Sequence, residues 1–167
     1  MDDNKLKTDF LDLIENNKKL IYKVSHMYCN RTIDKKDLFQ DIIFNLWISY
    51  SSFQNKSKIS TWIYRVSLNT AISWFRDHTK QSKNIEYTNL IPTLTDEGDS
   101  SFEELNERLY LAINSLGKID KAVILLLLDE YSYEEISEII GISKTNVSTK
   151  ISRIKLKLRN YLSNDKI

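Results

Sequence analysis

The sequence predicts an all-α protein of two small helical domains joined by a flexible linker. Gly and Pro, which interrupt helices, number only three and one in 167 residues. Apolar residues recur at helical spacing over most of the chain, but this periodicity fails between residues 81 and 101, where Pro92, Gly98 and many small polar residues stand. We therefore expect a first domain over residues 1–80, an acidic linker over 81–101 and a second domain over 102–167.

Composition argues against several classes of protein. A single Cys29 forms no internal disulfide, and with only His26 and His78 beside it we expect no metal site and no cofactor. No stretch approaches the roughly 18 apolar residues of a membrane span, and the acidic N-terminus is unlike a signal peptide. HExxH, nucleophile-elbow and P-loop motifs are absent, which disfavours a small hydrolase or nuclease. We expect a cytoplasmic binding protein that is not an enzyme and has no catalytic residue.

The formal net charge of +1 conceals two basic segments and one acidic segment. Residues 54–80 carry +4, residues 81–107 carry −6 and residues 141–167 carry +6. Two basic segments therefore flank an acidic connector, and each basic segment is suited to contact phosphate.

Three helical stretches are predicted in the first domain. The spacing of apolar residues from Phe10 to Tyr28 indicates one helix, or two with a break at residues 15–18. A core-facing helix should follow up to Tyr50, with Thr32 or Asp34 as its N-terminal cap. A third helix is expected over residues 60–77.

The second domain is predicted to contain a helix-turn-helix. Helices are expected over residues 102–116 and 119–129, and the apolar run 122–128 of the latter should be buried. Ser132 and Glu135 fit a capping box that begins a helix over residues 133–140. Gly141 can adopt the left-handed turn after it, and Ser143 can cap the next helix.

The last helix has the composition of a DNA-recognition helix. Its apolar residues fall on one side, which leaves a small, hydrogen-bonding and basic surface on the other. Asn can pair with adenine and Arg with guanine in the major groove. The alternative is an ordinary solvated terminal helix; the coincidence of a Gly turn, two caps and basic bias favours DNA binding. The inward residues are Val147, Ile151, Ile154 and Leu158, and the outward candidates are Lys144, Thr145, Asn146, Ser148, Thr149, Lys150 and Arg153.

A second basic surface is predicted on the third helix, along one line that avoids its apolar stripes. An aromatic residue among cations and an amide suits single-stranded nucleic acid, because a base can stack on the ring while cations hold the backbone. Phe53, in the preceding loop, can add a wedge. A buried Trp62 with solvated charges explains the periodicity equally well. The line contains Lys58, Trp62, Arg65, Asn69, Ser73 and Arg76.

The second helix carries apolar residues on the face opposite its core side. Phe44 and Ile48 stand there among Asp37, Asp41 and Asn45. Exposed apolar groups among acids indicate a protein-binding surface. The alternative is that other helices of the domain cover them.

Four segments together resemble the extracytoplasmic-function (ECF) subfamily of sigma-70 RNA polymerase sigma factors. They are DLFQD (residues 37–41), FQNKSKISTWIYRVSLNTAISWFR (53–76), YSYEEISEIIGIS (131–143) and NVSTKISRIKLKL (146–158). The resemblance implies a region 2-like helical bundle followed by a region 4-like helix-turn-helix domain. It also implies a function: directing core RNA polymerase to specific promoters and promoting DNA opening.

The resemblance further implies a partner for each surface. It implies binding of the polymerase β′ clamp helices by Asp37, Leu38, Gln40 and Asp41, with Phe44 and Asn45 as neighbours, and contact of the second domain with the β flap. It implies minus-ten recognition and melting by Phe53, Lys58, Trp62, Arg65, Asn69 and Arg76, with a flipped base near Asn69. It implies minus-thirty-five recognition by Lys144, Thr145, Asn146, Ser148, Thr149, Lys150 and Arg153, and an acidic linker in the RNA exit path. An anti-sigma factor is a further candidate partner, and no small-molecule substrate is implied.

One departure and one rival stand beside this resemblance. The family usually has a Pro-Glu pair after the position of Leu116, where this chain has Gly117 and Lys118, so the start of the following helix is open. The rival is a one-component regulator that binds duplex DNA unaided. Such a protein has no use for the basic surface within residues 53–76.

Overall fold

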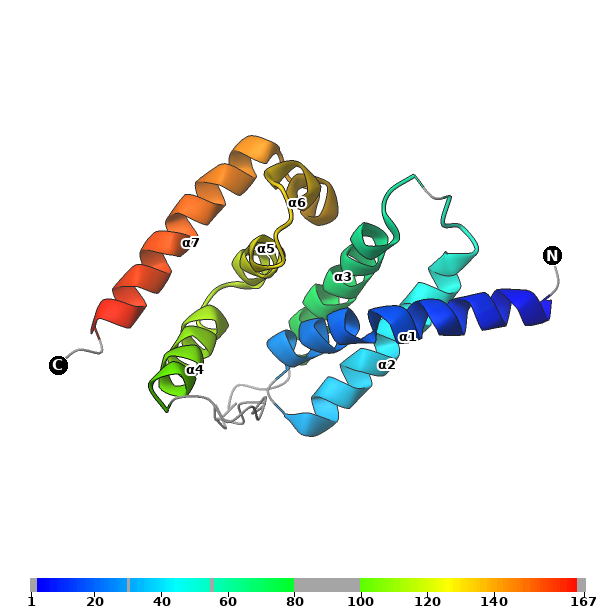
Figure 1. The fold of residues 1–167 in the computed structure, drawn as a ribbon, viewed down its shortest axis with the longest axis horizontal. Coiled ribbons are helices and arrows are strands. Elements are labelled where there is room, and N and C mark those ends of the chain that lie inside the picture. The colour runs from blue at the N-terminus through cyan, green and yellow to red at the C-terminus, as the bar shows by residue number, and fades with distance from the viewer. Residues whose placement is uncertain (1–2, 30, 55, 80–99, 165–167) are drawn as a thin grey trace. The chain divides into compact units, whose positions relative to one another are not determined.

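The computed structural model describes residues 3–29, 31–54, 56–79 and 100–164. All regular secondary structure in these residues is helical (Figure 1), so the predicted all-α class is confirmed. The chain divides into two compact units, Met1–Thr88 and Asn89–Ile167. Residues 81–99 of the predicted linker lie outside the described residues, and its last two residues, Ser100 and Ser101, already belong to a helix, α4 (Ser100–Asn114).

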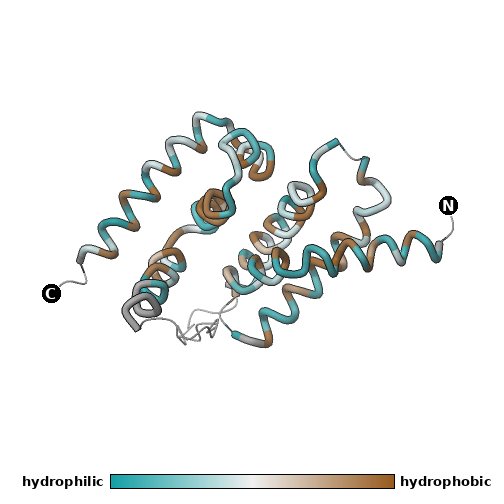
Figure 2. Tube along the Cα trace, viewed as in Figure 1, coloured by the Kyte–Doolittle hydropathy of each residue, from teal (hydrophilic) through white to brown (hydrophobic). Residues whose placement is uncertain are grey.

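The first unit is a bundle of three helices, α1 (Asp3–Tyr28), α2 (Thr32–Tyr50) and α3 (Ile59–Thr79). Each of them packs against the other two. Apolar and polar stretches alternate along all three helices (Figure 2), as expected when each helix buries one side and hydrates the other. Among the fully buried side chains of this core are Ile21, Val24, Leu38, Ile42, Leu46 and Ile63.

Helix α1 is continuous, so the predicted alternative of a break at residues 15–18 is wrong. Polar residues interrupt the apolar spacing there, but the segment contains no Gly or Pro that would end a helix. Lys18 pairs with Glu15 on the exposed side, at 3.1 Å. Asn17 donates from Nδ2 to the carbonyl of Leu13, at 2.8 Å. The polar segment therefore stays helical and faces solvent.

The predicted cap of α2 is also wrong. The helix begins one residue earlier than a Thr32 cap would require, so Thr32 and Asp34 lie inside it and Arg31 occupies the N-cap position without a side-chain cap bond. Asp34 instead stands in the first turn, where a negative charge complements the helix dipole.

The second unit contains α4 (Ser100–Asn114), α5 (Lys118–Leu128), α6 (Tyr133–Ile140) and α7 (Lys144–Asn164). Helix α7 packs against the other three. Its C-terminal end is tied to α4, because Arg108 donates from Nη2 to the carbonyl of Leu162 at 2.9 Å. The start of α5, which the departure from the family pattern left open, is at Lys118, with Gly117 as its cap residue.

Helix α5 is the buried centre of this unit, as predicted, apart from its last turn. Figure 2 shows it as the most continuously apolar helix, and residues 121–126 are buried. Leu128 is 56% exposed, so the expectation that the whole run 122–128 is buried is wrong at its end. Among the described helices, none is long and apolar enough to cross a membrane.

The turn between α6 and α7 follows the predicted local chemistry. Ser132 Oγ accepts from the backbone N–H of Glu135 at 3.2 Å, and the Glu135 carboxylate accepts from the backbone N–H of Ser132 at 2.9 Å. Gly141 ends α6 in the left-handed region, at φ 77° and ψ 33°. Ser143 Oγ accepts from the backbone N–H of Asn146 at 3.2 Å and so caps α7. The helix-turn-helix is therefore fixed by three local devices.

Gly141→Ala is expected to destabilise the second unit by about 1–2 kcal/mol, the cost of a Cβ in the left-handed region. An added Cβ would meet no atom within 4 Å, so conformation rather than a clash sets the loss. Gly141→Asn should lose less, because Asn tolerates this conformation better. All three Trp residues lie in the first unit. In urea unfolding of Gly141→Ala, the transition midpoint followed by circular dichroism should therefore fall, while the midpoint followed by Trp fluorescence stays unchanged. Equal losses of stability in Gly141→Ala and Gly141→Asn would contradict this account.

Candidate nucleic-acid and polymerase interfaces

The predicted line of residues on α3 faces outward. Lys58, Asn69, Ser73 and Arg76 are exposed, and Trp62 is half-buried. On the other side of the same helix, Ile63, Tyr64 and Leu68 are buried in the core. Burial of that stripe fixes which residues remain on the surface, so the line is a continuous face and not a scatter of side chains.

The loop residue Phe53 packs on Trp62 at one end of this face. The ring centroids are 4.9 Å apart with an interplanar angle of 34°. The ring centroid of Tyr50, the last residue of α2, lies 6.3 Å from that of Trp62. The backbone N–H of Phe53 donates to the Tyr50 carbonyl at 3.1 Å, which holds the loop against the helix end. A partly exposed aromatic pair beside cations is a surface on which a base can stack.

Arg65 lies between Trp62 and Asn69 on this face and is half-buried. Its Nε atom is buried and has no hydrogen-bond partner among the described residues. A buried donor without an acceptor costs about 1–3 kcal/mol. The Nε atom of Arg65 therefore keeps a hydrogen-bonding capacity that no described residue uses.

Asn69 opens onto a hollow between α2 and α3. Asp41 and Asn45 line the hollow from α2, opposite Asn69 and Ser73 of α3. Asn45 donates from Nδ2 to Thr70 Oγ1 at 3.1 Å, and Thr70 donates to the carbonyl of Val66 at 2.9 Å. The sequence assigned Asn45 and Asn69 to different partners, whereas the structure brings them to the same hollow.

The predicted polymerase-binding residues of α2 divide into an exposed set and one buried residue. Asp37, Gln40, Asp41, Phe44 and Asn45 are exposed, and Phe44 is 61% accessible. The alternative that other helices of this unit cover Phe44 and Ile48 is therefore wrong. Leu38 is fully buried, so it offers no atoms to a partner and acts only by holding α2 in the core.

An apolar groove between α1 and α2 extends this exposed face. Phe10 forms its floor, with its ring centroid 5.0 Å from that of Trp47 at an interplanar angle of 65°. Leu11 on one side of the groove and Phe44 on the other are more than 60% exposed. Sequence reasoning missed Leu11. The available signal was its position, because Leu11 is an apolar residue of α1 that stands outside the buried stripe of that helix. The groove is lined by Lys7, Phe10, Leu11, Gln40, Ile43, Phe44 and Trp47.

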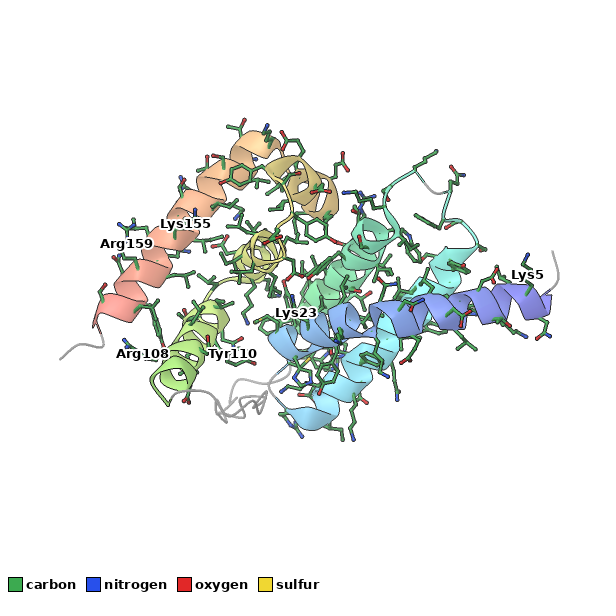
Figure 3. All side chains as sticks on the ribbon, viewed as in Figure 1. Lys5, Lys23, Arg108, Tyr110, Lys155 and Arg159 are labelled. Carbon is green, nitrogen blue, oxygen red and sulfur yellow. The ribbon has the colours of Figure 1, made fainter. Side chains whose placement is uncertain are left out.

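The predicted recognition surface on α7 is also exposed. Val147, Ile151 and Ile154 are buried on the inner side. On the outer side, Lys155 and Arg159 extend the basic field along the helix (Figure 3). The candidates that are exposed are Lys144, Thr145, Asn146, Ser148, Thr149 and Arg153, while Lys150 is half-buried.

Three lysines of α7 are paired with carboxylates of other helices. Lys144 forms an ion pair with Glu134 of α6, and both side chains are about 60% exposed. Lys150 and Lys157 both bind Asp120 of α5, at 2.8 and 3.2 Å. Burial by itself would raise the pKa of the Asp120 carboxyl, but the hydrogen bonds and charges of the two lysines lower that pKa overall. The hydrogen bond from Lys144 likewise lowers the pKa of Glu134. Sequence reasoning missed Asp120, because nothing local links it to α7.

Each of the two units matches a known protein-family model. The family model for sigma-70 region 2 matches residues 13–81, and the model for sigma-70 region 4 matches residues 106–158. RNA polymerase sigma factor YlaC of Bacillus subtilis is 32% identical over 136 residues, which cover 77% of each chain. The ECF RNA polymerase sigma factor SigW of Bacillus subtilis is 25% identical over 165 residues, covering 92% of this chain and 88% of SigW.

Two solved structures share the fold. The sigma factor RpoE, in complex with the anti-sigma factor NepR from Bartonella quintana, has a TM-score of 0.76 at 20% identity and covers 95% of this chain and 99% of its own. CnrH, in complex with the cytosolic domain of CnrY, has a TM-score of 0.69 at 19% identity and covers 96% of this chain and 91% of its own.

The two matched regions, in this order, define a promoter-specific sigma factor of transcription initiation. The chain belongs to the sigma-70 family of RNA polymerase sigma factors, in its ECF subfamily. The resemblance inferred from the four sequence segments is thereby confirmed.

Proposed function

We propose that the two units divide the work of promoter recognition. Residues 1–80 bind core RNA polymerase and recognise and melt the minus-ten element. Residues 102–167 read the minus-thirty-five element, and residues 81–101 form the acidic linker between them. The observation that carries the proposal is the outward face of α3, where Trp62 and Asn69 stand among cations. A regulator that binds only duplex DNA has no use for such a face.

The exposed part of the α2 face, together with the apolar groove beside it, is the surface we assign to the β′ clamp helices. Its apolar centre, Phe44 with Leu11, is flanked by the exposed polar residues Lys7 and Gln40 of the same groove. An apolar centre with a polar rim is typical of protein–protein interfaces. Leu38 supports this surface from within the core.

Further partners follow from the family rather than from a site on this chain. Both structural relatives were solved as complexes with other proteins, an anti-sigma factor in one case and the cytosolic domain of CnrY in the other. We infer that an anti-sigma factor can also bind this chain, and that the second unit contacts the β flap. Because bacterial promoters and RNA polymerase are cytoplasmic, the protein acts in the cytoplasm. It contributes binding energy and no catalysis of its own.

Run-off transcription tests the proposal as a whole. The purified chain, added to core RNA polymerase on a library of promoter fragments, should give transcripts with defined start sites, and core polymerase without it should not. Failure to form a complex with core polymerase at any salt concentration, with the chain folded by circular dichroism, would refute the assignment.

Asn69→Ala should impair promoter opening while leaving polymerase binding intact. Loss of one hydrogen bond to a base edge, worth about 0.5–1.5 kcal/mol, predicts a roughly 2- to 13-fold drop in open complex. Permanganate footprinting of unpaired thymines would measure it. Asn16→Ala makes the same change at an exposed position of α1 and is the matched control. Equal footprints for the two variants would remove Asn69 from the site.

Arg153→Ala should cost about 1–3 kcal/mol in binding and relax the preference for one base in the minus-thirty-five element. Binding to promoters with each single base replaced would locate that position. Arg159→Ala removes an exposed cation farther along α7 and should weaken binding to all sequences alike. A uniform loss for Arg153→Ala as well would mean that Arg153 contacts a phosphate instead of a base.

Phe44→Ala should weaken the complex with core polymerase by about ten-fold or more, because a central aromatic residue often dominates an interface. Ile33→Ala is the matched control, since Ile33 is on the same helix and is 58% exposed against 61% for Phe44. Neither truncation removes core packing, so both variants should fold. Titration of core polymerase by fluorescence anisotropy would separate them, and equal affinities would argue against this docking surface.

A further inference from the structure

Four residues form a straight line on one flank of α7. Asn146, Lys150, Arg153 and Lys157 follow one another at spacings of four, three and four, which places them along a single side of a helix. Asn146 and Arg153 are exposed. The two lysines on this line are the ones that bind Asp120.

Asp120 uses its two carboxylate oxygens for two different lysines. Lys150 Nζ lies 2.8 Å from Oδ1, and Lys157 Nζ lies 3.2 Å from Oδ2. Arg153 stands between these lysines in the sequence, yet makes no ion pair among the described residues. The carboxylate therefore holds both lysines and leaves the guanidinium exposed.

The position of Asp120 limits the movement of its carboxylate and keeps it partly shielded from water. Its side chain is only 16% exposed, and the residues that follow it, 121–126, are buried in the centre of the unit. It stands in the first turn of α5, where the helix dipole favours a negative charge. The pair between Lys144 and Glu134 differs in its carboxylate: Glu134 is 60% exposed and is screened by water and salt, whereas Asp120 is 16% exposed, although Lys144 and Lys157 are equally exposed at about 60%.

We propose that Asp120 is a specificity-determining residue of the DNA-binding surface: it withholds Lys150 and Lys157 from phosphates, so that this flank of α7 meets the promoter through Asn146 and Arg153. This inference removes Lys150 from the minus-thirty-five recognition residues that the resemblance implies. The inference rests on the proposed function of the second unit. Lysine–phosphate contacts strengthen binding to every sequence alike, whereas contacts to base edges distinguish sequences. Holding two lysines back lowers non-specific affinity and leaves the base-reading side chains in place.

The salt dependence of DNA binding tests this inference, because its slope counts the phosphates that a protein neutralises. The holoenzyme of the full chain with core polymerase would be titrated onto a cognate promoter and onto an unrelated duplex between 50 and 200 mM KCl. In Asp120→Asn the slope should steepen by about 0.9 for each lysine released, or about 1.8 for both. The affinity ratio between the two salt concentrations then grows roughly 12-fold. The ratio of specific to non-specific binding should fall.

Lys150→Met and Lys157→Met provide a second test that leaves Asp120 in place. If both lysines are withheld in the native protein, neither change alters the slope; a decrease of about 0.9 in either variant means a direct phosphate contact and overturns the inference. This arm decides the question even if Asp120→Asn fails to fold.

Two further comparisons exclude a simple effect of net charge. Glu138→Gln removes one negative charge from an exposed position on α6 and should leave the slope unchanged. Adding Lys150→Met and Lys157→Met to Asp120→Asn should return the slope to the native value. A steeper slope that persists in this triple variant, or an unchanged slope in folded Asp120→Asn, overturns the inference. Absence of any holoenzyme with the native chain would instead refute the proposed function.

Discussion

Each surface that we assign to DNA depends on burial of the opposite side of its own helix. Val147 and Ile154 of α7 and Ile63 of α3 are completely buried. Each such side chain contributes about 1.5–3 kcal/mol when removed from water, so rotating either helix about its axis would cost several times that amount. The apolar stripe therefore fixes which polar residues face outward, and the chemistry of recognition follows from the packing of the core.

In the second unit, tertiary contacts decide which basic side chains of α7 are paired with carboxylates. Residues 141–167 carry +6, which by itself indicates a strongly basic helix. Three of its lysines nevertheless bind carboxylates on α5 or α6. Under the proposed function, the cations that contact DNA are then fewer than the sequence indicates, because Asp120 binds two of these lysines. A basic segment therefore sets an upper limit on phosphate contacts and not their number.

In the first unit the two predicted binding faces are neighbours. Asp41 and Asn45 of α2 and Asn69 of α3 line one hollow, and a hydrogen bond from Asn45 to Thr70 joins the two helices there. Phe44 of α2 lines the separate groove that α2 forms with α1. Under the proposed function, promoter DNA and polymerase would therefore be held on adjoining sides of the same pair of helices.

Local chemistry allowed the sequence to determine a large part of this protein. The bounds of α6, the left-handed Gly141 and the two caps around it were predicted because each depends on residues within one turn of helix. The outward faces of α3 and α7 were predicted because helical periodicity follows directly from spacing. The family was predicted as well, because each of the four segments carries its motif within a short stretch of chain and the segments follow one another in the family's order.

The tertiary structure alone decided what the packed helices do to one another. It buried Leu38, which shares a motif with exposed residues; it left Leu128 exposed at the end of an apolar run; and it joined Asn45 to Thr70. It also brought Asp120 to Lys150 and Lys157, which are 30 and 37 residues away in the chain. The physical reason is the same in each case: periodicity and capping act within a few residues, whereas burial and ion pairing depend on which helices pack together.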